Sequence, residues 1–171
     1  MEERSGVISI DLTKRLALVL AGISVAVPFV TSNQIITGTI VNFLLFVTPK
    51  KYVWPVIVFP SLAVMARGII FGPLTPFVYY FIPFIWMGNW MLAKLASQGH
   101  PLQGIFVKVA ILYVGANVFV IFKIAPKIFL TSMGIMQLVT AVLGGIIAII
   151  ILKKLRHSER SKAQSRNLWD Q

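Results

Sequence analysis

The side chains of this sequence that could do chemistry among apolar neighbours are neutral amides and hydroxyls, together with one arginine. The residues that stand out in this way are Asn33, Gln34, Thr37, Arg67, Tyr79, Asn117 and Gln137. Amides and hydroxyls donate and accept hydrogen bonds, and aromatic rings provide apolar walls, so this set favours a pocket for a small polar ligand. Arg67 would contact an anionic group of that ligand. In the alternative interpretation, the tyrosines and Arg67 reach lipid headgroups and the hydroxyls bond to their own helix.

Catalytic groups are scarce in the apolar part of the chain. All five acidic residues stand near the two ends of the sequence, as Glu2, Glu3, Asp11, Glu159 and Asp170. Proton and sodium relays usually need a carboxylate inside the membrane, and hydrolases need a catalytic acid or base. The chain has no cysteine, and its two histidines, His100 and His157, lie in polar segments. We therefore expect no enzyme activity, no metal centre and no cofactor.

The composition predicts that most of the chain lies in lipid. Hydrophobic residues make up 57% of the 171 residues, charged residues make up 12%, and the mean hydropathy is +0.85. Soluble domains carry about 25% charged residues. The net charge of +11 would indicate nucleic acid in a soluble chain. Here the positive residues flank apolar runs, so membrane topology and anionic lipid explain the charge, and we expect no nucleic-acid partner.

Apolar runs that end at charges or turn residues predict an all-α, polytopic membrane protein with about six transmembrane helices. The runs cover residues 16–30, 34–48, 52–72, 73–95, 102–122 and 129–152. The first two runs have about 15 residues each, against the 20 or so that a bilayer core needs, so a re-entrant pair is the alternative there. The sequence thus predicts one helical domain, 1–152, and a basic, disordered cytoplasmic tail, 153–171.

The distribution of lysine and arginine predicts the orientation in the membrane. If both termini are cytoplasmic, twelve of the sixteen basic residues lie in segments 1–15, 49–51, 94 and 153–171. Only Lys123 and Lys127 then lie outside, while Arg67 and Lys108 fall within spans. This positive-inside bias favours a multi-pass protein of the plasma membrane. We expect Lys108 to extend its side chain toward the inner headgroups.

Small residues recur at a spacing of four in the first and last runs. In the first run these residues are Ala17, Ala21, Gly22 and Ala26, and in the last run they are Ala141, Gly144, Gly145 and Ala148. Small faces of this kind let a second helix approach closely. The spacing alone leaves open whether that second helix belongs to the same chain or to a partner.

Two stretches, Gln34–Asn42 (QIITGTIVN) and Pro76–Asn89, which ends in PFIWMGN, carry a family resemblance. They resemble a group of small bacterial six-helix membrane proteins that are similar to the substrate-binding S components of energy-coupling factor transporters. Some relatives carry the label "iron hydrogenase", which does not suit a chain without cysteine to hold iron. The resemblance covers most of the chain.

The resemblance implies a transport function. An S component captures a vitamin-like nutrient near the outer face and works with a transmembrane coupling subunit and two cytoplasmic ATPases. Carried over to this sequence, Asn33, Gln34 and Thr37 would bind or gate the nutrient, and the coupling subunit would contact Ala17, Ala21, Gly22 and Ala26. The sequence has no phosphate-binding loop of its own, so ATP would be used by a partner. The alternative is a non-catalytic structural or assembly subunit of a membrane complex.

Overall fold

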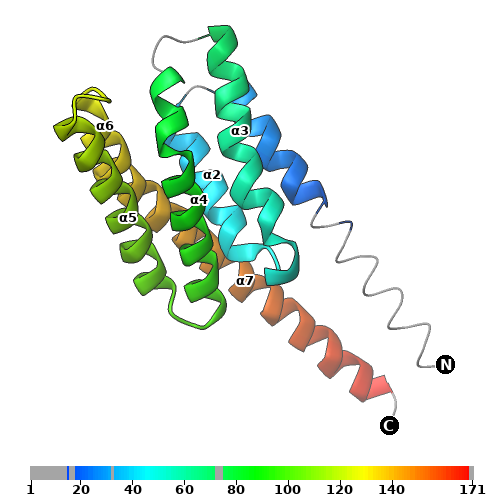
Figure 1. The fold of residues 1–171 in the computed structure, drawn as a ribbon. Coiled ribbons are helices and arrows are strands. Elements are labelled where there is room, and N and C mark those ends of the chain that lie inside the picture. Colours follow the sequence, from blue (N-terminus) through cyan, green and yellow to red (C-terminus); the bar gives the residue numbers. More distant parts are fainter. Residues whose placement is uncertain (1–14, 16–17, 32, 72–74, 170–171) are drawn as a thin grey trace.

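The computed structural model describes residues 15, 18–31, 33–71 and 75–169, and these residues form helices with no strand among them. The N-terminal helix is described from Leu18 to Val30. After it come α2 (Gln34–Val47), the 3-10 turn η1 (Lys50–Tyr52), α3 (Val53–Phe71), α4 (Thr75–Ser97), α5 (Pro101–Ile121), α6 (Ile128–Met133) and α7 (Ile135–Trp169). The all-helical prediction is confirmed for these ranges (Figure 1).

The helices form a bundle with two distinct ends (Figure 1). Helix α6, the start of α2 and the end of α3 lie at one end, which we call the α6 end. The η1 turn and the connection between α4 and α5 lie at the other, which we call the η1 end. Lys50 and Lys51 therefore lie at the η1 end, and Lys123 and Lys127 lie at the α6 end. The positive-inside bias makes the η1 end the expected cytoplasmic side.

Local signals set where the helices begin and end. The Asn33 side chain caps α2, because its Oδ1 accepts hydrogen bonds from the backbone N–H groups of Ile35 and Ile36 at 2.9 and 3.3 Å. Gly99 has a φ of +87° just after α4, a conformation that glycine adopts without strain. Pro101 then opens α5. This short turn makes α4 and α5 antiparallel neighbours.

Glycines allow the two closest helix pairs, α2 with α7 and α4 with α5, to approach each other. A Cβ atom on Gly144 of α7 would lie 2.8 Å from the carbonyl oxygen of Thr39 in α2. On α5, a Cβ atom on Gly104 would lie 3.1 Å from the carbonyl oxygen of Leu92 in α4. A side chain at either position would push the backbones apart. The small face predicted around residues 141–148 therefore packs within this chain.

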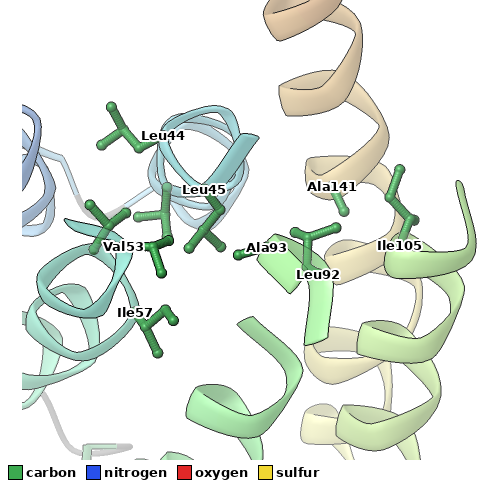
Figure 2. Packing of buried hydrophobic residues seen from close by; sticks show 10 residues of the cluster. Leu44, Leu45, Val53, Ile57, Leu92, Ala93, Ile105 and Ala141 are labelled. Atoms are coloured by element: carbon green, nitrogen blue, oxygen red, sulfur yellow. The ribbon is translucent and has the colours of Figure 1, made fainter. Parts of the chain in front are cut away.

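Apolar side chains fill the η1 end of the bundle. Figure 2 shows side chains from α2, α3 and α4 converging there, with additional side chains from α5 and α7. The labelled residues are Leu44, Leu45, Val53, Ile57, Leu92, Ala93, Ile105 and Ala141. Branched side chains from three helices interlock at this end, so it resembles the close-packed interior of a globular domain.

A second cluster, which is aromatic, holds α6 against α4 and α5. The Phe81 ring of α4 stacks on the Phe129 ring of α6, with centroids 4.8 Å apart. Phe119 of α5 meets the Phe81 ring edge-on at 5.1 Å. Offset-stacked and edge-to-face contacts stabilise aromatic pairs beyond their burial. This cluster fixes the short helix beside the site described below.

The last predicted run, 129–152, differs from the structure in two ways. The helix is divided at Gly134, whose backbone angles (φ −99°, ψ −96°) lie outside the helical region. Helix α7 then continues to Trp169, although the sequence predicted a disordered tail from residue 153. No glycine or proline occurs between Lys153 and Trp169, and lysine, arginine, alanine and glutamine propagate a helix well. The continued helix corrects the disordered-tail expectation.

Two helical segments are long and apolar enough to cross a membrane. Pro101–Ile121 has a mean hydropathy of 2.1 and Ile128–Lys154 one of 2.6, yet only 33% and 28% of these windows are buried. Their apolar surface mostly faces outward, where lipid is a better solvent than water. Leu18–Val30 and Gln34–Val47 are also apolar but shorter. These helices support a membrane association, while the six-span topology and the plasma-membrane location stay predictions.

Candidate functional site

A cavity of about 400 Å³ lies in the half of the bundle nearer the α6 end. This volume falls in the range of roughly 300–1,000 Å³ that is typical of small-molecule sites. Its walls are mainly apolar and are formed by Pro28, Val41, Pro60, Val64, Val78, Ile85, Phe129 and Met133. Polar side chains project among them, namely Thr31, Gln34, Thr37, Asn42, Ser61, Arg67, Asn89, Lys108, Ser132 and Gln137. In small-molecule sites, apolar walls provide most of the contact area and a few polar groups fix the orientation of the ligand.

Hydrogen bonds between α2, α3 and α6 form the rim of the cavity. Gln34 Nε2 donates to the backbone oxygen of Ser132 at 3.0 Å, and Ser132 Oγ donates back to Gln34 Oε1 at 2.9 Å. The backbone oxygen of Thr31 accepts from Thr37 Oγ1 and from Arg67 Nη1, each at 3.4 Å. These bonds hold the start of α2 against α6 and place the Arg67 guanidinium at the rim.

The floor of the cavity is a buried polar chain that joins α5, α2 and α7. Lys108 is 3% exposed, and its Nζ donates to Asn42 Oδ1. Asn42 Nδ2 donates to Thr140 Oγ1 at 3.1 Å, and Thr140 Oγ1 donates to the backbone oxygen of Gln137 at 3.2 Å. The stem of Lys108 crosses α4 at Gly88, where a Cβ atom would lie 3.2 Å from Lys108 Cγ. The absence of a side chain at Gly88 thus leaves room for the Lys108 side chain to reach this floor.

One polar group in the cavity wall has no hydrogen-bond partner. Asn89 of α4 is 3% exposed, and its Oδ1 is unpaired. The neighbouring Ser61 hydroxyl, in contrast, is satisfied, because it accepts from Trp86 Nε1 and donates to the backbone oxygen of Val58, both at 2.7 Å. Buried polar atoms are nearly always paired. The Asn89 oxygen is therefore an acceptor that a bound molecule can satisfy.

The structure brings together four of the seven residues that the sequence singled out for ligand binding. These four are Gln34, Thr37, Arg67 and Gln137, which come from three helices and line the same cavity. Their convergence is the point that the sequence left open, because polar residues on separate helices do not reveal which way they face.

The other three predicted binding residues lie outside this cavity lining. Asn33 instead caps α2. Tyr79 is 42% exposed. Asn117 Nδ2 donates at 2.8 Å to the backbone oxygen of Tyr113, one turn earlier in its own helix. Asn117 therefore agrees with the alternative interpretation, in which a polar side chain hydrogen-bonds to the backbone of its own helix.

The predicted orientation of Lys108 was wrong, because its side chain turns into the bundle rather than toward a headgroup. Gly104 lies four residues before it and Gly115 seven residues after it, and both are buried against α4. Residues at these spacings share one face of a helix. The two glycines were the sequence signal for the inward face. Asn42, two helical turns after Gln34, could have been assigned to the cavity face by the same argument.

The small residues of the N-terminal helix do not form one face. Ala17 lies outside the described residues. Ala21 is 7% exposed and packs within the chain, which corrects its predicted contact with a partner. Gly22 and Ala26 are exposed, and a Cβ atom on Gly22 would meet nothing within 4 Å. Only these two retain the exposure that a partner helix needs.

The electrostatic character of the cavity is positive. Arg67 stands at the rim and Lys108 on the floor, and none of the residues that line the cavity is aspartate or glutamate. Among the described residues, no group of histidine, cysteine, aspartate or glutamate side chains could hold a metal ion.

Comparisons with protein-family models, curated proteins and solved structures give no match to this chain. Its function is therefore argued from the cavity.

Proposed function

We propose that this chain is a substrate-binding membrane subunit that captures a small vitamin-like nutrient, in the manner of an S component of an energy-coupling factor transporter. The observation that supports this most is the cavity of about 400 Å³ with polar groups set in apolar walls. The cavity lies nearer the α6 end, which the positive-inside bias predicts to face outward. The nutrient would thus enter from outside the cell.

The rim would act as the gate for the nutrient. The reciprocal hydrogen bonds between Gln34 and Ser132 span it, and both side chains lie where water can replace the lost partners. Exchanging a protein hydrogen bond for one to water costs little, of the order of 1 kcal/mol. The rim can then open without disturbing the apolar core at the η1 end. Arg67 would attract anionic groups toward the entrance.

The energy for transport would come from partners. The cavity lining contains no carboxylate to relay protons or sodium ions, and the sequence contains no phosphate-binding loop. We assign the exposed face around Gly22 and Ala26 to a transmembrane coupling subunit that works with two cytoplasmic ATPases. The neighbouring side chains Leu18 and Val30 are 72% and 84% exposed, so the same face presents apolar surface to a partner helix or to lipid.

The proposal is tested by purifying the full chain from native membranes in mild detergent. Native mass spectrometry would identify retained small molecules, and proteomics would identify co-purifying proteins. We expect a retained nutrient, and a membrane partner together with ATPases. The Gly22→Leu variant should lose the partner and keep the nutrient, whereas Arg67→Ala should lose nutrient uptake and keep the partner.

A different outcome would replace the transport function by a structural one. If the folded protein holds other membrane proteins without ATPases, retains no molecule from a nutrient panel, and shows normal uptake as Arg67→Ala, the chain is an assembly subunit. The cavity would then be an ordinary gap between helices.

A further inference from the structure

The floor of the cavity contains a buried lysine whose Nζ faces no acidic side chain among the described residues that line the cavity. Lys108 is 3% exposed, and the group that its Nζ contacts is the neutral amide of Asn42. Among the described residues that line the cavity, none is acidic. A buried ammonium group is costly unless an opposite charge compensates it. A bound anion would therefore stabilise the charged form of this buried amine.

The charge on the floor selects the kind of anion. An ammonium group has three donors, of which Asn42 uses one, so two remain for a bound molecule. One positive charge matches one carboxylate, whereas a phosphate group carries about −1.5 to −2 and would leave excess negative charge in an apolar cavity. Arg67 stands at the rim, away from the floor. It is bonded at the rim, and Gln34 on that rim stands eight residues from Asn42 along α2, about 12 Å at 1.5 Å per residue.

The wall beside the floor defines a second feature of the ligand. Asn89 Oδ1 is a buried acceptor without a donor. A ligand that satisfies it must carry an N–H or O–H group. The remaining wall on this side consists of apolar side chains such as Val41 and Ile85, which favour an apolar body between the polar groups.

We propose that the cavity takes an organic monocarboxylate whose carboxylate binds Lys108 on the floor and whose N–H or O–H group donates to Asn89 Oδ1. This inference rests on the proposed function, in that it presumes that the cavity captures a small molecule. Arg67 then guides the anion to the entrance, and Lys108 holds it.

The test uses the full chain in lipid nanodiscs with two matched pools of probes. One pool contains 4-aminobenzoate, nicotinate, indole-3-acetate and hexanoate, and the other contains the primary amide of each acid. Retention is measured by native mass spectrometry after gel filtration. We expect one or more carboxylates to be retained at least about tenfold better than their amides, because a hydrogen bond to a charged group is among the strongest that a site can make.

Variants then separate the floor from the rest of the molecule. Lys108→Met should reduce carboxylate retention at least about tenfold, while the matched control Lys153→Met, on the exposed part of α7, should leave it unchanged. Asn89→Leu should weaken binding of 4-aminobenzoate and leave hexanoate, which has no donor group, unaffected.

The outcomes distinguish this inference from the proposed function. If the amides are retained as well as the acids, or if Lys108→Met behaves like Lys153→Met, the carboxylate assignment is overturned while the capture of a small molecule stands. If the native chain retains no member of either pool, and also carries no small molecule from native membranes, both the inference and the proposed function are overturned. Should Lys108→Met not fold, the 4-aminobenzoate to hexanoate ratio of Asn89→Leu decides the assignment.

Discussion

The two ends of the bundle are built from the same helices but are filled differently. At the η1 end, Leu44 of α2, Ile57 of α3 and Leu92 of α4 meet and are 1%, 0% and 0% exposed. Toward the α6 end, the faces of the same helices that line the cavity carry smaller or polar side chains and leave a space of about 400 Å³. Helices α2 and α7 are in close contact at two places beside the cavity, because Gly38 lies against the side chain of Thr140 and Gly144 lies against the backbone of Thr39 and Phe43. The cavity therefore lies next to tightly packed glycine positions, on helix faces that carry small or polar side chains.

The largest loss of folded protein is expected from a substitution at Gly144, where α7 packs against α2. Its Cβ would lie 2.7 Å from the backbone nitrogen of Phe43 and 2.8 Å from the backbone oxygen of Thr39, and neither atom can move aside. Gly144→Leu should therefore abolish the monodisperse peak in gel filtration. Gly22→Leu is the matched control, because nothing lies within 4 Å of that position. A well-folded Gly144→Leu protein would show that the helix contact is less close than described.

The next prediction concerns stability. It compares the cost of truncating a side chain at the filled η1 end with the cost of truncating one in the cavity wall. Leu92→Ala should lower the free energy of unfolding by about 2–5 kcal/mol, because it opens a new void in a close-packed core. Val64→Ala merely enlarges an existing space and should cost less than about 1.5 kcal/mol. Unfolding in mixed micelles measures both. Equal costs would mean that the two ends are packed alike.

A smaller effect is expected at Asn42, which separates the filled end from the cavity. Asn42→Leu removes the acceptor for Lys108 and the donor for Thr140, and should lower the free energy of unfolding by about 1–3 kcal/mol. Adding Lys108→Met should restore part of that loss, because the unpaired charge disappears. A double-mutant cycle measures this coupling. Strict additivity would show that the two side chains do not interact.

The smallest effect is expected at the rim. Gln34→Ala removes two hydrogen bonds to Ser132 that are accessible to water, so the free energy of unfolding should fall by less than about 1 kcal/mol. Hydrogen exchange should nevertheless quicken at the start of α2 and in α6, with no change near Leu44. If exchange quickened equally at both ends, the rim would not be a separate opening unit.

Local signals allowed much of the helix pattern to be predicted from the sequence. The cap at Asn33 and the turn at Gly99 act on adjacent residues, so the sequence reveals them directly. The break at Gly134 was missed, because glycine is tolerated inside apolar helices and its contacts with Leu130 and Tyr113 appear only in the folded chain. The helical tail was missed, because high charge was taken to outweigh helix propensity.

The site was only partly predictable, because the direction of a polar side chain depends on how its helix is rotated against its neighbours. Arg67 and Gln137 turned out to face the cavity, while Asn117 satisfies itself on its own helix. The rotation of α5 is set by Gly104 and Gly115, which lie against α4. Those two glycines are the feature of the sequence that indicates an inward direction for Lys108.

Helix α7 has a further mechanical consequence. Its 35 residues run without interruption from Ile135 to Trp169 and pass the cavity at Gln137 and Thr140 (Figure 1). The part beyond Leu152 is a lever about 25 Å long at 1.5 Å per residue, and a tilt of about 10° at the bundle would displace its tip by about 4 Å. A change of tilt beside the cavity would therefore be measurable by a distance probe on the last turn of this helix.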